Sequence, residues 1–285
     1  MKINGREIAG KIFEDLKIKV EKLRKKGTIP HLYIITLTTD PASEAYVGQK
    51  RKKGAEIGAK ITLENLDPKI STEELLKKVE KLNNDQSVHG IIIQRPLPPN
   101  IDERAIANSI NPNKDVDGFH PNSKFSPPVG EAVIKILEEV HSSTSEVDAR
   151  EPLRFTGWLR SKKISVIGRG VTAGAPIIKT LVKIGVKPLI VASQTQNRKE
   201  ILKNSNIVIC AVGKPDILKK SDIKKGAILI GVGMFRADDG KFHSDYEEED
   251  IKDIASSYTP TPGGVGPVNV SMLLSNLLKS AENSY

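Results

Sequence analysis

The second half of the chain, from Lys163 to Gly233, alternates short apolar runs with amphipathic stretches, and this alternation constrains the fold most strongly. The runs "KISVIG", "KPLIVAS", "NIVICAVG" and "GAILIGVG" have the length and β-branched content of buried strands. The segments "APIIKTLVKIG" and "NRKEILKNS" between them are predicted helices. Strands separated by helices form parallel βαβ units, so this half is predicted to be a Rossmann-like, doubly wound parallel sheet.

The first half of the chain also alternates strands and helices. A helix is predicted over residues 7–27, a strand in "HLYIITL", and a helix in "STEELLKKVEKLNN" that Ser71 or Thr72 caps. The buried strand "VHGIIIQRPLPP" is followed by a long polar loop over residues 110–128 and by a helix over residues 130–140. Residues 141–157 are predicted to be a flexible connection. The fold class is therefore α/β with two α/β domains, divided near residues 140–160.

The composition narrows the class of protein. The 285 residues are 38% hydrophobic and 28% charged, as in folded globular chains, and the net charge of +9 favours an anionic partner. Aromatic residues are only 4% and the cations are scattered, which speaks against nucleic acid. The single cysteine, Cys210, excludes a disulfide and favours a reducing, cytoplasmic location. Neither a secretion signal nor a membrane span is expected.

The first strand of the second half ends in a glycine turn. Gly168, Gly170 and Gly174 in "VIGRGVTAG" permit a tight turn and a close approach of backbone to a pyrophosphate. The helix that follows offers free N–H groups to phosphates. This context favours a dinucleotide site over a purely structural turn.

The end of the next strand bears on which dinucleotide binds. An NAD site usually has an acidic residue about 20 residues after the glycines. Here Ser193, Gln194 and Thr195 stand at that place, so NADP is favoured and NAD remains possible. Three cations are within reach of a 2′-phosphate: Arg169, Arg198 and Lys199.

Four cations, residues 50–53, follow a tyrosine in "EAYVGQKRKKGAEIG". On a helix, Tyr46, Lys50, Lys53 and Ile57 share a stripe about 60° wide, whereas the other two cations point elsewhere. A lysine on a helix is usually exposed to solvent and has no chemical role. This stripe, however, is bounded by Tyr46 and Ile57, which indicates that it is partly buried or lines a cleft. Lys50 is therefore a candidate for chemistry, with Gln94 at the end of a buried strand as a neighbour that could orient it.

Two further segments carry candidate binding residues. "TPTPGGVGPVN" holds Pro262, Gly263 and Gly264, which can lay backbone flat against a planar ligand. Asp115 and Asp117 in "KDVDGFH" lack ligands at metal spacing, so no metal is expected. A carboxylate that accepts N–H groups of a heterocycle is the preferred interpretation.

Taken in order, these motifs resemble the bifunctional methylenetetrahydrofolate dehydrogenase/methenyltetrahydrofolate cyclohydrolase family. "DPASEAYVGQKRK", "GIIIQRPLP", "NPNKDVDGFH", "GRGVTAGAP", "AVGKPDI" and "TPTPGGVGP" carry the resemblance, which covers residues 2–280. The chain departs from the family pattern at Gly170, Gln194, Gly231 and Asn269.

The resemblance implies a folate-binding domain over residues 1–145, a Rossmann-like NAD(P)-binding domain over residues 146–267, and a cleft between them. It also implies that a C-terminal helix over residues 268–285 packs back on the first domain, and that the protein is a homodimer. The implied partners are tetrahydrofolate derivatives, possibly polyglutamylated, with neither nucleic acid nor membrane.

The resemblance further implies the roles of single residues. The implied catalytic residues are Lys50, Gln94, Tyr46 and Asp117, and the substrate-binding residues are the same four with Pro262, Gly263 and Gly264. The implied cofactor-binding residues are Gly168, Arg169, Gly170, Gly174, Ser193, Gln194, Val212, Gly213, Gly233 and Gly264.

The implied chemistry is hydride transfer from the methylene bridge to NADP, then hydrolysis of the methenyl cation to 10-formyltetrahydrofolate. A protonated Lys50 about 4 Å from that cation would cost roughly 4 kcal/mol at an effective dielectric of about 20, which favours the neutral amine as a base. Four alternatives stay open: a monofunctional relative, a non-catalytic folate- or nucleotide-binding homologue, a dehydrogenase resembling shikimate dehydrogenase, and a nucleic-acid binder.

Overall fold

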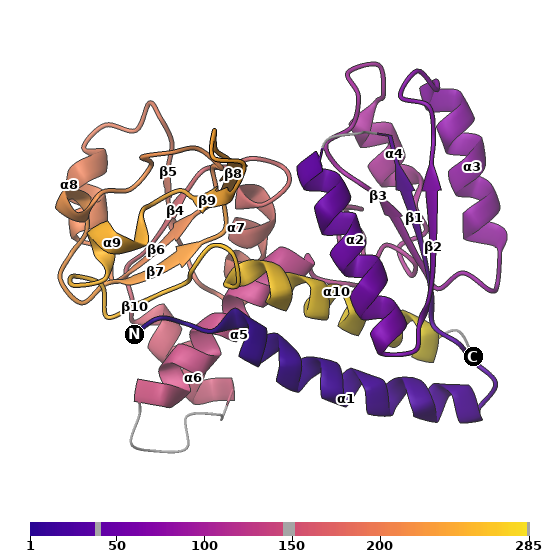
Figure 1. The fold of residues 1–285 in the computed structure, drawn as a ribbon, viewed down its shortest axis with the longest axis horizontal. Coiled ribbons are helices and arrows are strands. Elements are labelled where there is room, and N and C mark those ends of the chain that lie inside the picture. The colour runs from indigo at the N-terminus through magenta and orange to yellow at the C-terminus, as the bar shows by residue number, and fades with distance from the viewer. Residues whose placement is uncertain (38–40, 145–151, 284–285) are drawn as a thin grey trace. The chain divides into compact units, whose positions relative to one another are not determined.

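The computed structural model describes residues 1–37, 41–144 and 152–283, drawn in Figure 1. The helices in these ranges are α1 (Gly5–Lys25), α2 (Pro41–Glu56), α3 (Thr72–Asn84), α4 (Glu103–Ser109), α5 (Pro128–Thr144), α6 (Pro152–Arg160), α7 (Gly174–Lys183), α8 (Arg198–Lys203), α9 (Glu248–Ile251) and α10 (Val265–Glu282). The strands are β1 (His31–Thr36), β2 (Lys60–Asn65), β3 (Gly90–Ile93), β4 (Ile164–Ile167), β5 (Leu189–Val191), β6 (Ile207–Cys210), β7 (Ile228–Gly231), β8 (Met234–Arg236), β9 (Phe242–Ser244) and β10 (Ser257–Tyr258).

The chain forms two compact α/β units, as the sequence predicts. Unit 1 comprises Met1–Ala9 and Val129–Asn269, and unit 2 comprises Gly10–Pro128 and Val270–Tyr285. Each unit has its own sheet and is described by itself.

The boundaries of the units differ from the predicted ones. The expected boundary between residues 145 and 146 lies outside the described residues, and the contacts separate the units between residues 128 and 129 instead. The reason is visible at Gly130, where a Cβ would lie 2.0 Å from Thr180 Oγ1 of α7, so the start of α5 packs tightly within unit 1. The first residues of the chain also belong to unit 1, because Lys2 forms a bridge with Tyr258 of β10.

Unit 2 has a three-layer core around a parallel sheet of order β2-β1-β3. Side chains of a strand alternate between faces. Leu32 and Ile34 of β1 therefore pack with α1, α2 and the second part of α10, while Ile35 packs with α3 and α4. Figure 1 shows α2 and α3 on opposite sides of this sheet.

The C-terminal helix α10 holds the polar loop that follows α4. Leu273, Leu274 and Leu277 lie in the core of unit 2. The Asn276 side chain donates to the carbonyls of Val116 and Ser126, each over 3.0 Å. The loop that carries Asp115 and Asp117 is thereby fixed, although it contains no helix or strand.

Unit 1 contains a parallel sheet of order β10-β7-β6-β4-β5. From β4 the chain moves to β5 on one side and then returns to β6 on the other, so β4 and β6 flank the point where the strand order reverses. Ligands of open parallel sheets bind at the carboxyl ends of strands at such a point. The confirmed Rossmann-like order therefore directs attention to the loops after β4 and β6.

Several local predictions were wrong or incomplete. Residues 141–157 are not one connection, because α5 runs to Thr144 and α6 begins at Pro152, with residues 145–151 outside the described part. The buried side chains of Phe155 and Leu159, four residues apart, give α6 its core-facing stripe. The sequence analysis also missed β2 and the β8–β9 hairpin. No helix in the described ranges has the length and apolar character needed to cross a membrane.

Candidate active site

Helix α2 separates one lysine from its neighbours. Lys50 is 3% exposed, whereas Arg51 and Lys52 are exposed to solvent. Its Nζ lies 4.8 Å from the ring centroid of Tyr46, one turn earlier on the same face. Lys53, on the same stripe, forms an ion pair with Glu56 over 2.6 Å. The stripe predicted from the sequence is present, and its buried cation is Lys50.

The amine of Lys50 is held by a fixed amide. Lys50 Nζ donates to Gln94 Oε1 over 2.9 Å, and Gln94 Nε2 donates to the carbonyl of Arg95 over 2.9 Å. Gln94 follows β3, and its backbone N–H donates to the carbonyl of Ile35 in β1. The side-chain oxygen of Gln94 therefore faces the amine because the amide nitrogen is already used.

Burial changes the protonation of this lysine. Removal from water lowers the pKa of Lys50, and the nearby charge of Asp117 raises that pKa in part. A buried amine with a lowered pKa can accept a proton near neutral pH, which an exposed lysine does not do.

The two aspartates of the polar loop have different surroundings. Asp115 is 1% exposed, and its Oδ2 accepts the backbone N–H of His120 over 2.8 Å. Burial raises the pKa of Asp115, and the charge of Asp117 acts in the same direction. Gly118 has φ +75°, and a Cβ there would lie 2.8 Å from Pro127 N. Asp115 thus builds the turn, and Asp117 is the carboxylate that remains partly accessible.

Arg95 is a site neighbour that the sequence analysis missed. Its guanidinium stacks 4.0 Å from the ring centroid of Phe119 and pairs with Glu103. Arg95, Asp115, Asp117 and Phe119 line one pocket with apolar residues around β3. The sequence signal was its place directly after Gln94, but arginine is usually exposed, and only the fold shows that this one is half-buried.

In unit 1, the glycine turn after β4 depends on two of its three glycines. Gly168 has φ +97°, and a Cβ there would lie 2.5 Å from the carbonyl oxygen of Ala211. A Cβ on Gly174 would lie 2.4 Å from the oxygen of Gly168, whereas Gly170 has open space around it. Helix α7 begins at Gly174, and its N-cap residue Ala173 makes no side-chain cap. The N–H of Ala175 donates to the carbonyl of Gly170 over 3.0 Å and Pro176 has no N–H, so in this first turn the N–H of Gly174 is the candidate for a phosphate.

The residues expected near a 2′-phosphate lie after β5. Ser193, Gln194 and Arg169 are exposed. Thr195 is used internally, since its Oγ1 accepts the N–H of Ala192 over 2.8 Å. The guanidinium of Arg198 donates to the carbonyl of Ile217 and so braces a loop instead.

The loop after β6 holds the next predicted cofactor residues. Val212 is 37% exposed, and Gly213 has φ +75°. The buried carboxylate of Asp245, which the sequence analysis missed, accepts N–H groups from this loop. Gly233 packs against it, since a Cβ on Gly233 would lie 2.1 Å from Asp245 Oδ2.

The glycine-rich segment before α10 belongs to unit 1. Gly263 has φ +104°, and a Cβ there would lie 3.4 Å from Arg6 Nε. A Cβ on Gly264 would lie 2.5 Å from the carbonyl oxygen of Pro260. Backbone packing thus demands glycine at position 264, while Pro262 is exposed.

The departure at Gly231 has a structural explanation. A Cβ on Gly231 would lie 2.6 Å from Ser244 Oγ and 3.0 Å from Tyr246 Oη. Tyr246 fills this space and donates to the carbonyl of Thr259 over 2.7 Å. Any side chain at position 231 would collide with these two residues, so Gly231 and Tyr246 form a packing pair.

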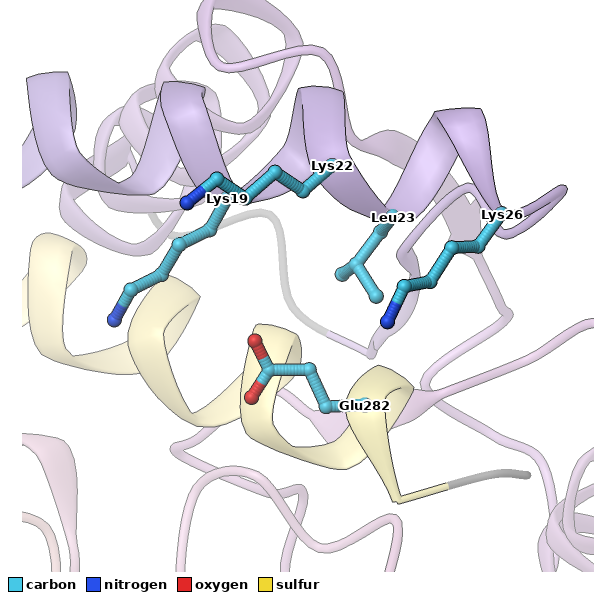
Figure 2. Close-up of a pocket in the computed structure, with 5 residues that line it drawn as sticks. All are labelled: Lys19, Lys22, Leu23, Lys26 and Glu282. Carbon is cyan, nitrogen blue, oxygen red and sulfur yellow. The ribbon is translucent and has the colours of Figure 1, made fainter.

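Unit 2 has a second, basic pocket on another part of its surface (Figure 2). Lys19, Lys22, Leu23 and Lys26 of the C-terminal part of α1 and its end line it together with Glu282 of α10. It shares no residue with the Lys50 group.

Unit 2 therefore brings together Tyr46, Lys50, Gln94 and Asp117, and unit 1 carries the glycine turn and the residues of the adjoining loops. A buried amine held by an amide, together with a separate nucleotide-binding type of sheet, defines a two-unit α/β protein built for chemistry on a small ligand. Family models identify the class more closely. The model described as "Tetrahydrofolate dehydrogenase/cyclohydrolase, catalytic domain" matches residues 3–117, and the NAD(P)-binding domain model of the same family matches residues 153–285. The chain belongs to the tetrahydrofolate dehydrogenase/cyclohydrolase family.

Individual relatives agree over nearly the full length. The chain is 39% identical to "Bifunctional protein FolD" of Acetivibrio thermocellus, covering 98% of this chain and 96% of that protein. The crystal structure of the bifunctional enzyme from Campylobacter jejuni superposes with a TM-score of 0.90 at 34% identity, covering 100% and 99% of the chains. The Trypanosoma brucei enzyme, solved with NADP cofactor and an inhibitor, gives 0.88 at 32% identity, covering 100% and 98%.

Proposed function

We propose that the protein oxidises 5,10-methylenetetrahydrofolate to 5,10-methenyltetrahydrofolate with NADP⁺, and then hydrolyses the methenyl form to 10-formyltetrahydrofolate. The single observation that carries the proposal is the Lys50 amine, which is 3% exposed, bound to Gln94 over 2.9 Å and lowered in pKa by burial. Family membership and the bifunctional relatives support the choice of substrate.

Lys50 acts as the base in ring opening. The neutral amine takes a proton from the water that attacks the methenyl carbon, and the positive charge of the substrate opposes protonation of Lys50 before that step. Gln94 accepts an N–H of the amine, which directs the lone pair of the amine away from the amide. Tyr46 covers Lys50 and limits its contact with water.

Asp117 binds the folate ring system. A carboxylate accepts two N–H donors of a pterin edge, and such charge-assisted hydrogen bonds are stronger than neutral ones. The loop that carries Asp117 is fixed by Asn276 of α10, so the carboxylate is held in place before the ligand arrives.

Unit 1 holds the nucleotide. The residues fit it, since the glycine turn leaves the start of α7 uncapped at the point where the strand order reverses. NADP⁺, when bound, accepts the hydride from the methylene bridge. The N–H of Gly174 at the start of α7 binds its pyrophosphate. Ser193 with Arg169 binds the 2′-phosphate, since no carboxylate stands in the segment Ser193–Thr195 to repel it.

We also propose that the protein acts as a homodimer in the cytoplasm and accepts folates with polyglutamate tails. The net charge of +9 supports an anionic tail. The buried, single cysteine supports a reducing compartment. Sedimentation of the purified protein as a species of about 31 kDa, the mass of one chain, would contradict the dimer.

The replacement Lys50→Met tests the function. Methionine keeps the length of the side chain and removes the base, so methenyl hydrolysis is expected to fall at least a hundredfold while some NADPH production remains. NADPH formation and methenyl decay are measured by absorbance in parallel on one preparation. Lys52→Met, on the exposed face of the same helix, is the matched control and should keep both rates.

The two assays also separate the alternatives. Normal hydrolysis in Lys50→Met would remove Lys50 from the mechanism. A wild-type protein with only one of the two activities would be a monofunctional relative, and one with neither activity, but with thermal protection by NADP, would be a binding homologue.

A further inference from the structure

Asp245 is a buried carboxylate that follows the β8–β9 hairpin. It is 0% exposed, and its side chain accepts three successive backbone N–H groups, those of Val212 (3.1 Å), Gly213 (2.6 Å) and Lys214 (3.0 Å). Its carbonyl oxygen also accepts the N–H groups of Ile217 and Leu218, at 3.0 and 3.1 Å. One residue thus clamps both ends of residues 212–218.

The clamped loop lies where a nucleotide of a parallel sheet is expected. It follows β6, which pairs with β4 in the sheet, and a Cβ on Gly168 would lie 2.5 Å from the oxygen of Ala211. The glycine turn and the clamped loop therefore touch at the carboxyl ends of two neighbouring strands. Any shift of the loop would alter the surface offered beside the glycine turn.

Successive N–H groups that converge on one point make an anion-binding nest, which in other proteins takes a phosphate. In this loop the protein's own carboxylate fills that place. The loop cannot offer these three N–H groups to a phosphate of the nucleotide. What it can present is the side chain of Val212, which is 37% exposed, and carbonyl oxygens that accept hydrogen bonds.

We propose that Asp245 is a positioning residue that sets the loop over residues 212–218 against the nicotinamide ring of the nucleotide. The α7 N-terminus is left to bind the pyrophosphate. The inference rests on the proposed NADP-dependent oxidation and deepens it. Asp245 acts through the loop and does not touch the ligand.

The clamp also gives a reason for Gly233. A Cβ at this position would lie 2.1 Å from Asp245 Oδ2 and 2.4 Å from Gly213 N. The sequence predicted that Gly233 binds the cofactor. Its position between β7 and β8 gives it a structural role as well, because the missing side chain leaves room for the carboxylate of Asp245.

The test is Asp245→Asn, which keeps size and removes charge. The amide oxygen can accept two of the three N–H groups, but the amide nitrogen then faces a donor. We expect the KM for NADP⁺ to rise at least tenfold, with methenyl hydrolysis, measured without nucleotide, within twofold of wild type. Inhibition by adenosine 2′,5′-bisphosphate, which lacks the nicotinamide half, should keep its Ki within twofold.

The control is Asp238→Asn, an exposed aspartate in the turn between β8 and β9. It removes the same charge near the hairpin and should leave all three measurements unchanged.

Each other outcome overturns the inference. A KM for NADP⁺ within twofold of wild type would show that the clamp does not position the nucleotide. Equal weakening of NADP⁺ and the bisphosphate, or loss of hydrolysis as well, would show general damage to the fold. If the wild-type protein showed no NADP-dependent oxidation, the proposed function itself would be refuted, whatever the variant does.

Discussion

Lys50 and Lys52 are the same chemical group two residues apart, and their surroundings make them different reagents. Lys52 is exposed to water, while Lys50 is buried beside Tyr46 and Gln94. Desolvation disfavours the charged form of an amine, so burial lowers the pKa of Lys50 and favours its neutral form, which can act as a base. The charge of Asp117 opposes this shift and raises the pKa of Lys50 in part, so Asp117 acts on the protonation of Lys50 in addition to its proposed contact with folate.

Replacing Asp117 with asparagine should therefore change the pH profile of ring opening. The Asp117 charge raises the pKa of Lys50, so its removal lowers that pKa further. Ring opening needs the neutral amine and slows as the pH falls through the lysine pKa. The pH below which the hydrolysis rate falls is therefore expected to be lower in Asp117→Asn than in wild type. The KM for folate should also rise about tenfold or more, because charged hydrogen bonds to the ligand are lost.

The measurement is the hydrolysis rate at saturating methenyl substrate between pH 5 and pH 9. Asp67→Asn, in the turn before α3, is the control, since the Asp67 side chain accepts the N–H of Lys69 at an exposed site of the turn. A limb that moves to higher pH in Asp117→Asn would contradict the electrostatic argument.

At the scale of elements, a histidine pair ties the three strands of unit 2 together. His31 begins β1, its Nδ1 donates to the carbonyl of Ser87 over 3.0 Å, and its Nε2 shares a hydrogen bond with the Thr62 hydroxyl of β2 over 2.8 Å. The backbone N–H of His31 donates to His89 Nδ1 before β3 over 3.2 Å. The Nδ1 of His89 is thus an acceptor, which is possible only while that ring is neutral.

This pair should make unit 2 sensitive to acid. Burial lowers the pKa of both His31 and His89, with the charges of Lys60 and Lys114 acting in the same direction and Asp85 opposing. The unfolded chain then takes up protons more readily than the folded one below the ordinary value of 6.5. The contribution of the two neutral histidines to the free energy of unfolding is therefore fully present above that pH, and it declines as the pH falls below it.

The measurement is urea unfolding at pH 7 and pH 5. The double variant His31→Gln, His89→Gln should lose less stability than wild type over this interval, by about 1 kcal/mol. His243 is half-buried on β9, and Asp239 raises its pKa, so His243→Gln serves as the control without this acid-side effect. An unchanged pH slope in the double variant would refute the account.

At the scale of the molecule, the chain divides into two compact units, and its single cysteine, Cys210, lies in unit 1. Cys210 lies in β6 at the centre of the unit 1 sheet and is 0% exposed. Burial raises the pKa of its thiol, with the charge of Asp245 adding to this. The thiol reacts only when unit 1 opens.

Maleimide labelling of Cys210 should therefore be slowed by the nucleotide. Ligand at about 100 times its Kd stabilises the native state by roughly 2.7 kcal/mol, which slows labelling through opening by about a hundredfold. NADP is expected to protect more than NAD at equal concentration. Labelling that neither nucleotide slows would place nucleotide binding outside unit 1.

The sequence by itself determined what depends on near neighbours. The alternation of strands and helices predicted the two α/β units. The segment "STEELLKK" predicted a helix capped by Ser71 or Thr72, and the structure shows Ser71 as the cap, with a complete capping box to Glu74. The glycine turn after β4 was predicted because it needs only local backbone freedom. The short, edge-forming β2 was missed although Ile61 and Leu63 alternate with polar residues, because this run has only two apolar side chains and none of its residues is fully buried.

Only the tertiary structure decided which polar groups are buried and what they bind. Lys50 and Gln94 are 44 residues apart, Val212 and Asp245 are 33 apart, and α10 reaches Val116 across 160 residues. A sequence shows that Lys50 and Asp245 can ionise, but the cost of burying a charge, and the donors that offset it, depend on the packed neighbours. The placement of the base and of the loop clamp therefore follows from the fold.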